Sequence, residues 1–198
     1  MTATVFLVRH AAHEFQDKRH VGRMQGVKLG PKRESHLGWL RERFAREALD
    51  AVWASPVSRA QETAAAVANG GPVRTDEALN EIDFGRWMGM TTEEVDRDPE
   101  WRLWNDSKST FRIPGGETIL EMQSRMVDAV DRARREHAGG KVALCSHGDP
   151  IKSVLAYHLG MPVDRIDNFE VGHPSVSALV VGDWGAKVLW INERPVDA

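Results

Sequence analysis

Short apolar runs alternate with longer segments of helical periodicity along this chain, and this alternation restricts the fold more than any other sequence feature. The apolar runs are rich in β-forming residues and predict strands at residues 3–8, 51–54, 72–74 and 141–145. The segments that repeat apolar residues at helical spacing predict helices at residues 34–48, 55–68, 117–137 and 148–159. This alternation predicts a three-layer α/β/α sandwich with a mainly parallel central sheet.

The remaining segments complete this outline of the fold. Residues 176–182 and 187–192 are predicted as two strands joined by a glycine-bearing turn, which can form an antiparallel edge of the sheet. Residues 11–33 are polar and irregular and are predicted as a loop. Ser55 is predicted to cap the helix that follows the second strand. Residues 76–114 hold three tryptophans and two methionines among short helices and loops, and we expect them to form a cap over a single domain of residues 1–198.

Composition excludes several classes of protein. A chain of 198 residues with 41% hydrophobic content can bury a core without covalent cross-links. No apolar run reaches the roughly 18 residues needed to span a bilayer, and no secretory signal is recognisable. The single cysteine, Cys145, cannot form an internal disulfide bond. The sequence therefore predicts a cytoplasmic protein without a membrane partner.

The net charge of −3 conceals an asymmetry between two parts of the chain. Residues 1–46 contain ten Lys or Arg and four Asp or Glu, whereas the remainder of the chain is acidic. An acidic protein is a poor candidate for binding nucleic acid. The basic segment fits either a local pocket for a small anion or a chance clustering on a solvated surface.

Arginine and histidine residues follow three of the predicted strands. Arg9 and His10 follow the first strand, Arg59 lies just beyond the second, and His147 follows the strand at 141–145. Because ligands bind at the carboxyl edge of parallel sheets, we expect these side chains to converge there, beside the backbone N–H groups of the helix that begins at Gly148. Each residue alone is more typical of a structural role. Together they predict a site for a phosphoryl group, whose oxygens match the guanidinium fork.

Five segments of the sequence resemble the histidine phosphatase superfamily, also called the phosphoglycerate mutase-like superfamily, over nearly the whole chain. They are Leu7-Val8-Arg9-His10, the stretch from Ser55 to Thr63, the stretch from Leu79 to Gly85, Gly115-Gly116-Glu117-Thr118, and Ser146-His147-Gly148. Each motif is weak alone, but their order along the chain is specific. The resemblance implies the phosphoglycerate mutase-like fold and a phosphoric monoester hydrolase of the histidine acid type.

The resemblance also implies roles for individual residues. His10 would accept the phosphoryl group as phosphohistidine, and Glu81 would protonate the leaving oxygen and then activate water. Arg9, Arg59 and His147 would bind the phosphoryl oxygens, together with the backbone at Gly148. Fixed positive charge of this kind can support phosphoryl transfer without a cofactor or metal ion.

The segment after His10 departs from the family pattern. The family usually has glycine after the catalytic histidine, where this chain has Ala11, and Ala12 and His13 replace the acidic or amide residue and the hydroxyl residue that often follow. Gln16 falls where an asparagine is common and is a candidate phosphate ligand. His13 faces the substrate or belongs only to the loop. These changes affect the choice of substrate more than the catalytic residues.

Other functions stay open at this point. The same pocket serves a phosphomutase, although the chain lacks an obvious insertion of the mutase type and favours a phosphatase acting on a small phosphorylated metabolite. A non-catalytic member that binds a phosphorylated ligand is a second alternative. A metalloenzyme based on His10, His13 and His20 is a third, but no carboxylate-rich metal signature accompanies them. The Trp-rich residues 87–104 either shape the mouth of the pocket or pack internally. Members of the family are often dimeric, so a homodimer is one alternative.

Overall fold

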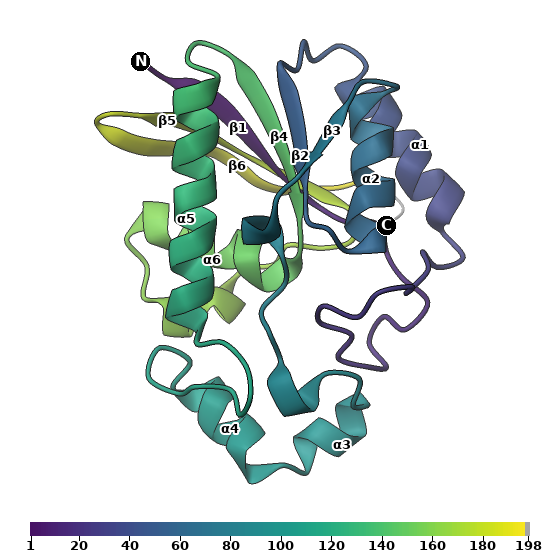
Figure 1. The fold of residues 1–198 in the computed structure, drawn as a ribbon, viewed down its shortest axis with the longest axis vertical. Coiled ribbons are helices and arrows are strands. Elements are labelled where there is room, and N and C mark those ends of the chain that lie inside the picture. Colours follow the sequence, from purple (N-terminus) through teal and green to yellow (C-terminus); the bar gives the residue numbers. More distant parts are fainter. Residues whose placement is uncertain (197–198) are drawn as a thin grey trace.

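A six-stranded sheet forms the centre of the computed structural model, which describes residues 1–196 (Figure 1). Its strands are β1 (Ala3–Arg9), β2 (Ala51–Ala54), β3 (Val73–Thr75), β4 (Lys141–Ser146), β5 (Ser175–Gly182) and β6 (Gly185–Glu193). They lie in the order β3-β2-β4-β1-β5-β6. The strands β1 to β4 pair in parallel with one another, whereas β5 runs antiparallel to β1 and β6 antiparallel to β5. The predicted mainly parallel sheet with an antiparallel edge is confirmed.

Helices cover both faces of the sheet. On one face lie α1 (Arg33–Phe44) and α2 (Ser58–Ala68), and on the other lie α5 (Ile119–Glu136) and α6 (Gly148–Leu159) (Figure 1). Alternate residues of β1 point into the two layers: Val5 and Leu7 pack in the core under α5 and α6, and Phe6 and Val8 pack in the core under α1 and α2. A strand covered on both faces has to be apolar throughout, which explains the continuous apolar runs.

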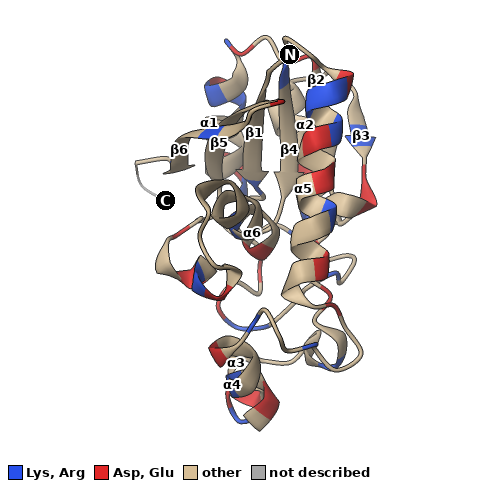
Figure 2. Cartoon of the chain, turned by 90° about the vertical axis from the view of Figure 1, so that its left-hand side faces the viewer, with Lys and Arg blue, Asp and Glu red and all other residues tan. Residues whose placement is uncertain are grey.

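Most charged residues correspondingly lie on the outside of the sandwich. In Figure 2 the helix α5 carries residues of both signs, whereas the central strands β1 and β4 are charged only at their ends, at Arg9 and Lys141. Within residues 1–196, no helix is both long enough and apolar enough to cross a membrane.

The segment from residue 76 to 114 lies beyond one end of the sheet, below α5 in Figure 1. It contains the 3-10 helices η1 (Glu77–Leu79) and η2 (Gly85–Trp87) and the short helices α3 (Thr92–Asp96) and α4 (Pro99–Asp106). Trp87 and Trp104 are buried in a separate apolar cluster that also contains Phe84, and this cluster packs against the 3-10 helix η3 (Val163–Asn168) through Ile166. Two of the tryptophans therefore form internal packing.

Two helices differ from the sequence prediction at one end. The first ends at Phe44 and not at residue 48, because the following turn is anchored to the start of β4: Glu47 binds the Lys141 ammonium at 2.7 Å, and Asp50 accepts the Lys141 N–H at 2.8 Å. The helix α2 begins at Ser58, and its N-cap residue, Val57, makes no side-chain cap. The prediction that Ser55 caps this helix was wrong.

Replacing Trp87 with alanine is expected to lower the free energy of unfolding by about 3–5 kcal/mol, because it removes a fully buried ring. It also removes the hydrogen bond that Nε1 donates to the Asp98 carboxylate at 2.9 Å. Urea unfolding followed by circular dichroism measures the change. The control is Leu103→Ala, whose side chain on α4 is 55% exposed and should contribute less than about 0.5 kcal/mol. A loss below about 1 kcal/mol for Trp87→Ala would show that the segment 76–114 unfolds separately from the sheet.

Candidate active site

Three parallel strands end side by side and bring their next residues together. Arg9 is in register with Ser146, and the His10 N–H donates to the Ser146 carbonyl at 3.1 Å. Because β4 lies between β1 and β2, the residues that follow all three strands share one edge of the sheet. The predicted convergence of Arg9, His10, Arg59 and His147 is what the structure shows, and the hydrogen bonds below connect three of these residues directly.

Four imidazole rings gather at this edge, and we call them the histidine cluster: His10, His13, His147 and His173. The His10 ring is 3% exposed, with its centroid 5.0 Å from that of His147, 4.7 Å from that of His173 and 5.8 Å from that of His13. His10 Nδ1 lies 2.8 Å from the Ala11 carbonyl, which can only accept, so Nδ1 carries the proton. The unprotonated Nε2 is left facing the Arg59 guanidinium, whose Nε donates to it at 3.1 Å.

The buried Arg59 side chain connects two of these rings. A second guanidinium nitrogen, Nη2, donates to His147 Nδ1 at 3.1 Å and to the Gly22 carbonyl. His147 Nε2 is therefore protonated and donates to Ser55 Oγ at 2.9 Å, and the Ser55 hydroxyl donates to Asn80 Oδ1 at the same distance. Ser55 thus orients His147 instead of capping α2.

Two buried cationic N–H groups have no hydrogen-bond acceptor within residues 1–196. They are Nε of Arg9 and Nη1 of Arg59, and both are buried. Burial lowers the pKa of both guanidinium groups, that of Arg59 to about 10. Arginine side chains nevertheless keep their charge near neutral pH. The Arg9 guanidinium packs on the start of α6, where a Cβ at Gly148 would lie 3.1 Å from it, so the absence of a side chain at Gly148 favours this close approach. Charged donors left free in this way suit a bound anion.

The Glu81 carboxyl is the candidate proton donor on the far wall of the site. It lines a pocket of about 280 Å³ together with Arg9, Arg59, Gly148 and Asp149. Desolvation by burial, followed by the charge of Asp149, raises the pKa of Glu81 to about 7. Burial also raises the pKa of Asp149. A carboxyl group with a raised pKa keeps its proton at the pH at which an acid catalyst has to supply it.

Residues of the segment 76–114, of the loop after His10 and of η3 form the outer wall of this pocket. They include Arg19, His20, Trp101, Trp104, Asn105, Lys108 and Asp167. Lys108 is 3% exposed, and its ammonium lies 2.9 Å from an Asp167 oxygen and 4.7 Å from the centre of the Trp104 ring. The wall thus offers aromatic surface and charges of both signs.

The two candidate residues of the loop after His10, His13 and Gln16, lie in different surroundings. His13 belongs to the histidine cluster, and its Nδ1 accepts from the Phe15 N–H at 3.2 Å. Gln16 is not among the residues that line the pocket, and its amide donates to the Asp17 carboxylate at 3.5 Å. Its role as a phosphate ligand stays a prediction without a contact in its support.

Sequence reasoning missed His173, whose Nδ1 donates to the His10 carbonyl at 3.0 Å. This residue precedes β5, which runs antiparallel to β1. Because β5 is antiparallel to β1, the residues before β5 lie at the same edge of the sheet as the residues after β1. The predicted antiparallel strand could therefore have indicated His173, had the residues before that strand been considered as well as those that follow the parallel strands.

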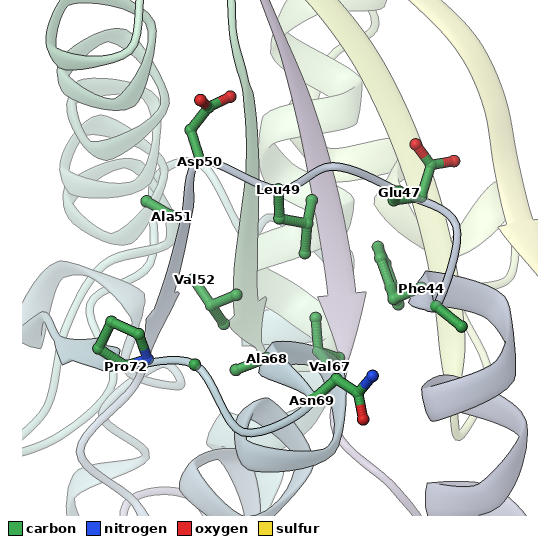
Figure 3. Close-up of a pocket in the computed structure, with 12 residues that line it drawn as sticks. Phe44, Glu47, Leu49, Asp50, Ala51, Val52, Val67, Ala68, Asn69 and Pro72 are labelled. Carbon is green, nitrogen blue, oxygen red and sulfur yellow. The ribbon is translucent and has the colours of Figure 1, made fainter.

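A second pocket, of about 270 Å³, lies beside the amino end of β2 (Figure 3). Its wall includes Phe44, Leu49, Asn69 and two carboxylates, those of Glu47 and Asp50. Its lining contains neither a histidine nor a cation, so it is unsuited to bind a phosphate group. The chemistry belongs to the opposite edge of the sheet.

Comparison with known proteins identifies the family. The model of the histidine phosphatase superfamily (branch 1) matches residues 5–194. This chain belongs to that superfamily. The resemblance based on the five ordered motifs is thereby confirmed, as is the predicted fold class.

Several relatives are similar to this histidine phosphatase over most of their length. Phosphoserine phosphatase 1 of Hydrogenobacter thermophilus is 28% identical over 195 residues, which cover 95% of this chain and 91% of the relative. A probable phosphoglycerate mutase of Yersinia enterocolitica is 32% identical, with 80% of this chain and 75% of the relative covered. The solved structure of a mycobacterial glucosyl-3-phosphoglycerate phosphatase has a TM-score of 0.87 at 22% identity, covering 98% of this chain and all of that one.

Acidification from pH 6.5 to 5 is expected to lower the free energy of unfolding. Burial and then neighbouring charges lower the pKa of every ring of the histidine cluster, that of His13 to about 4, so these rings take up protons in this range only after unfolding. Glu81 and Asp149 act in the opposite sense, because a raised pKa lets the folded state hold protons that the unfolded chain releases. We expect a net uptake of about one to two protons, or about 1–3 kcal/mol per pH unit.

The pH dependence of urea unfolding measures this slope. His173→Asn should reduce it by about one proton, because asparagine can still donate to the His10 carbonyl but does not titrate. Stability that is flat between pH 5 and 6.5 would contradict the uncharged state assigned to the cluster.

Proposed function

We propose that this histidine phosphatase hydrolyses small phosphomonoesters through a phosphohistidine intermediate on His10. The observation that carries the proposal is the pair of buried, unpartnered guanidinium N–H groups of Arg9 and Arg59 beside an unprotonated His10 Nε2. Phosphate oxygens would accept from both groups, which puts phosphorus within reach of this nitrogen. The proposal also covers the Gly148 backbone as a phosphoryl ligand. His147 becomes a phosphoryl ligand in this proposal only when Nδ1 gains a proton in place of the bond from Arg59, because Nε2 donates to Ser55.

The first half of the reaction transfers the phosphoryl group to the enzyme. When substrate binds, a phosphoryl oxygen accepts the hydrogen bond that Arg59 Nε gives to His10 Nε2 in the structure. The lone pair released on Nε2 attacks phosphorus, and the bond from phosphorus to the ester oxygen breaks. The Glu81 carboxyl gives its proton to that oxygen, so that a neutral alcohol leaves. The proton on His10 Nδ1 stays hydrogen-bonded to the Ala11 carbonyl and prevents the ring from attacking through the wrong nitrogen.

The second half returns the enzyme to its starting state. The Glu81 carboxylate takes a proton from water, the oxygen of that water attacks phosphorus, and the bond to Nε2 breaks. Inorganic phosphate leaves, and His10 and Glu81 regain their original protonation. The charges of Arg9 and Arg59 stabilise the equatorial oxygens in both halves.

The size of the pocket supports a small metabolite as substrate. Its volume of about 280 Å³ has to hold the phosphoryl group as well as the organic part. In this proposal residues 76–114 act as a cap, because Trp101, Asn105 and Lys108 form the outer wall where the organic part would lie. Lys108 and Asp167 provide opposite charges there, which favour a polar over a purely aliphatic substrate.

A phosphomutase of the phosphoglycerate mutase type stays the alternative, supported by the similarity to the probable mutase of Yersinia enterocolitica. The two reactions use the same groups and differ in whether water or a second substrate hydroxyl receives the phosphoryl group. A non-catalytic role has less support, since His10 and Glu81 are both in place.

Several further predictions belong to this proposal. Within residues 1–196, the structure brings together no group of three or more His, Cys, Asp or Glu side chains suited to a metal ion, and independence from metal ions and cofactors stays a prediction. A cytoplasmic location and a homodimer likewise stay predictions.

A panel of phosphomonoesters assayed for free phosphate tests the reaction class. The wild-type protein should release phosphate, and labelled substrate should leave acid-labile, alkali-stable phosphate on the protein. His10→Ala should lower turnover by at least about 10³-fold and abolish the labelling. The matched control is His158→Ala on α6, which should retain both. Labelling of His10→Ala would contradict the assigned nucleophile, and a positional isomer in place of free phosphate would favour the mutase.

Glu81→Gln should lower kcat/KM for an alkyl phosphomonoester by about 10²–10⁴-fold, because glutamine cannot protonate a poor leaving group. The loss for nitrophenyl phosphate should be much smaller, since nitrophenolate leaves without a proton. With the pKa of Glu81 raised to about 7, wild-type kcat/KM for the alkyl ester should fall about tenfold per pH unit above pH 7, the behaviour of an acid-type phosphatase. Rate measurements from pH 5 to 9 check both points, and equal losses on both substrates would argue against the acid role.

A further inference from the structure

The motif Gly115-Gly116-Glu117-Thr118 has no part in the mechanism above, although it lies against the loop that carries Glu81. We propose that Glu117, through Arg23 and Arg125, is a positioning residue that fixes the general acid by its main chain. The inference rests on the proposed function, because it assumes that Glu81 supplies the proton to the leaving oxygen.

The Glu117 carboxylate is the centre of a small ionic network. Arg125 binds it as a bidentate pair: Nε donates to Oε1 at 2.7 Å, and Nη2 donates to Oε2 at 3.0 Å. Arg23 adds a bond from Nη2 to Oε2 at 2.7 Å. The N–H of Asp83 also donates to Oε2, at 3.1 Å. One carboxylate thus holds two guanidinium groups that come from the loop after His10 and from α5.

Both guanidinium groups converge on the main chain of Glu81. Arg23 Nε donates to the Glu81 carbonyl at 2.8 Å, and Arg125 Nη2 donates to the same oxygen at 3.0 Å. Arg125 Nη1 donates to the carbonyls of Ala78 and Asn80, both at 2.7 Å. The loop that presents the acid contains no regular strand or helix at Glu81, so these bonds supply the restraint that a sheet or helix would give.

The loop that carries Glu117 packs closely against the loop that carries Glu81, and both loops have a glycine at this contact. A Cβ at Gly116 would lie 2.1 Å from the Asp83 carbonyl oxygen, and one at Gly85 would lie 2.2 Å from that of Pro114. The Glu117 N–H donates to the Asp83 carbonyl at 3.1 Å, so the two main chains are in direct contact. Gly116 of the motif therefore admits the contact, and Glu117 organises the two arginines.

The position of the acid matters most when the leaving oxygen needs its proton. A shift of about 1 Å in a catalytic group can cost roughly 10²-fold in rate. A misplaced Glu81 would therefore slow alkyl esters and spare nitrophenyl phosphate. Loss of general packing or of phosphate binding would slow both substrates alike. The ratio of the two kcat/KM values separates positioning from structure.

The test compares Glu117→Gln with wild type on an alkyl phosphomonoester and on nitrophenyl phosphate. Glutamine keeps the shape but loses the charge and one acceptor oxygen. We expect kcat/KM for the alkyl ester to fall by at least about tenfold, and that for nitrophenyl phosphate to stay within about threefold. Competitive inhibition by vanadate should change less than about twofold, because Arg9, Arg59 and His10 are untouched.

The matched control is Glu47→Gln at the far end of the sheet. The Glu47 carboxylate also links two cations, Arg43 at 3.0 Å and Lys141 at 2.7 Å, and its side chain is 19% exposed against 17% for Glu117. This variant should lose stability without changing the ratio of the two kcat/KM values. Should Glu117→Gln fail to fold, Arg23→Gln removes one donor to the Glu81 carbonyl from a more exposed side chain and should shift the ratio in the same direction.

The outcomes distinguish this inference from the proposal on which it rests. If Glu81→Gln discriminates between the two substrates and Glu117→Gln and Arg23→Gln do not, Glu81 is the acid but the network does not position it. If Glu81→Gln itself shows equal losses, the proposed mechanism fails first. A change of ratio in Glu47→Gln as large as that in Glu117→Gln would also overturn the positioning role.

Discussion

Two buried guanidinium groups at the carboxyl edge of the sheet determine how the other polar groups of the site are arranged. Main-chain carbonyls of Val171 and Gly22 accept from Arg9 and Arg59 and compensate part of the cost of removing these charges from water. Burial of the site, and then the positive charge of the guanidinium groups, lowers the pKa of the His10 and His147 imidazoles and so favours their uncharged form. An uncharged His10 retains the lone pair that a nucleophile needs. In the proposed mechanism, the charges that attract the phosphoryl group thus also keep His10 able to attack it.

Much of this arrangement follows from the sequence because strand ends are predictable. Arg9, His10 and His147 lie where short apolar runs end, and parallel pairing brings such positions to one edge. The capping role expected for Ser55 was wrong because the capping pattern is local, whereas its hydroxyl is engaged by His147 and Asn80 from distant parts of the chain. Gln16 was placed by counting through an irregular loop, in which the register of side chains does not follow from spacing.

Glu81 and the residues at the strand ends are held in place by different physical means. Arg9 and His10 are fixed by the hydrogen-bond ladder of the sheet itself. Glu81 lies in a loop whose place depends on contacts with another loop and on arginines from two further elements. Sequence reasoning finds the first kind of residue from periodicity. It finds the second only by resemblance, because no local pattern shows that Arg23 and Arg125 meet at one carbonyl.

The order of the strands also limits when the site can form during folding. The strands β1 and β2 do not pair with each other, since β4 lies between them and is followed by His147 from much later in the chain. Until β4 has been made, a chain emerging from the ribosome therefore has no strand that pairs with both β1 and β2 and places Arg9 beside Arg59. The repulsion between these two cations arises only after the central strands have begun to dock. The sheet can thus begin to assemble before Arg9 and Arg59 repel each other at its carboxyl edge. Pairing between strands that are far apart in the sequence makes this assembly slow.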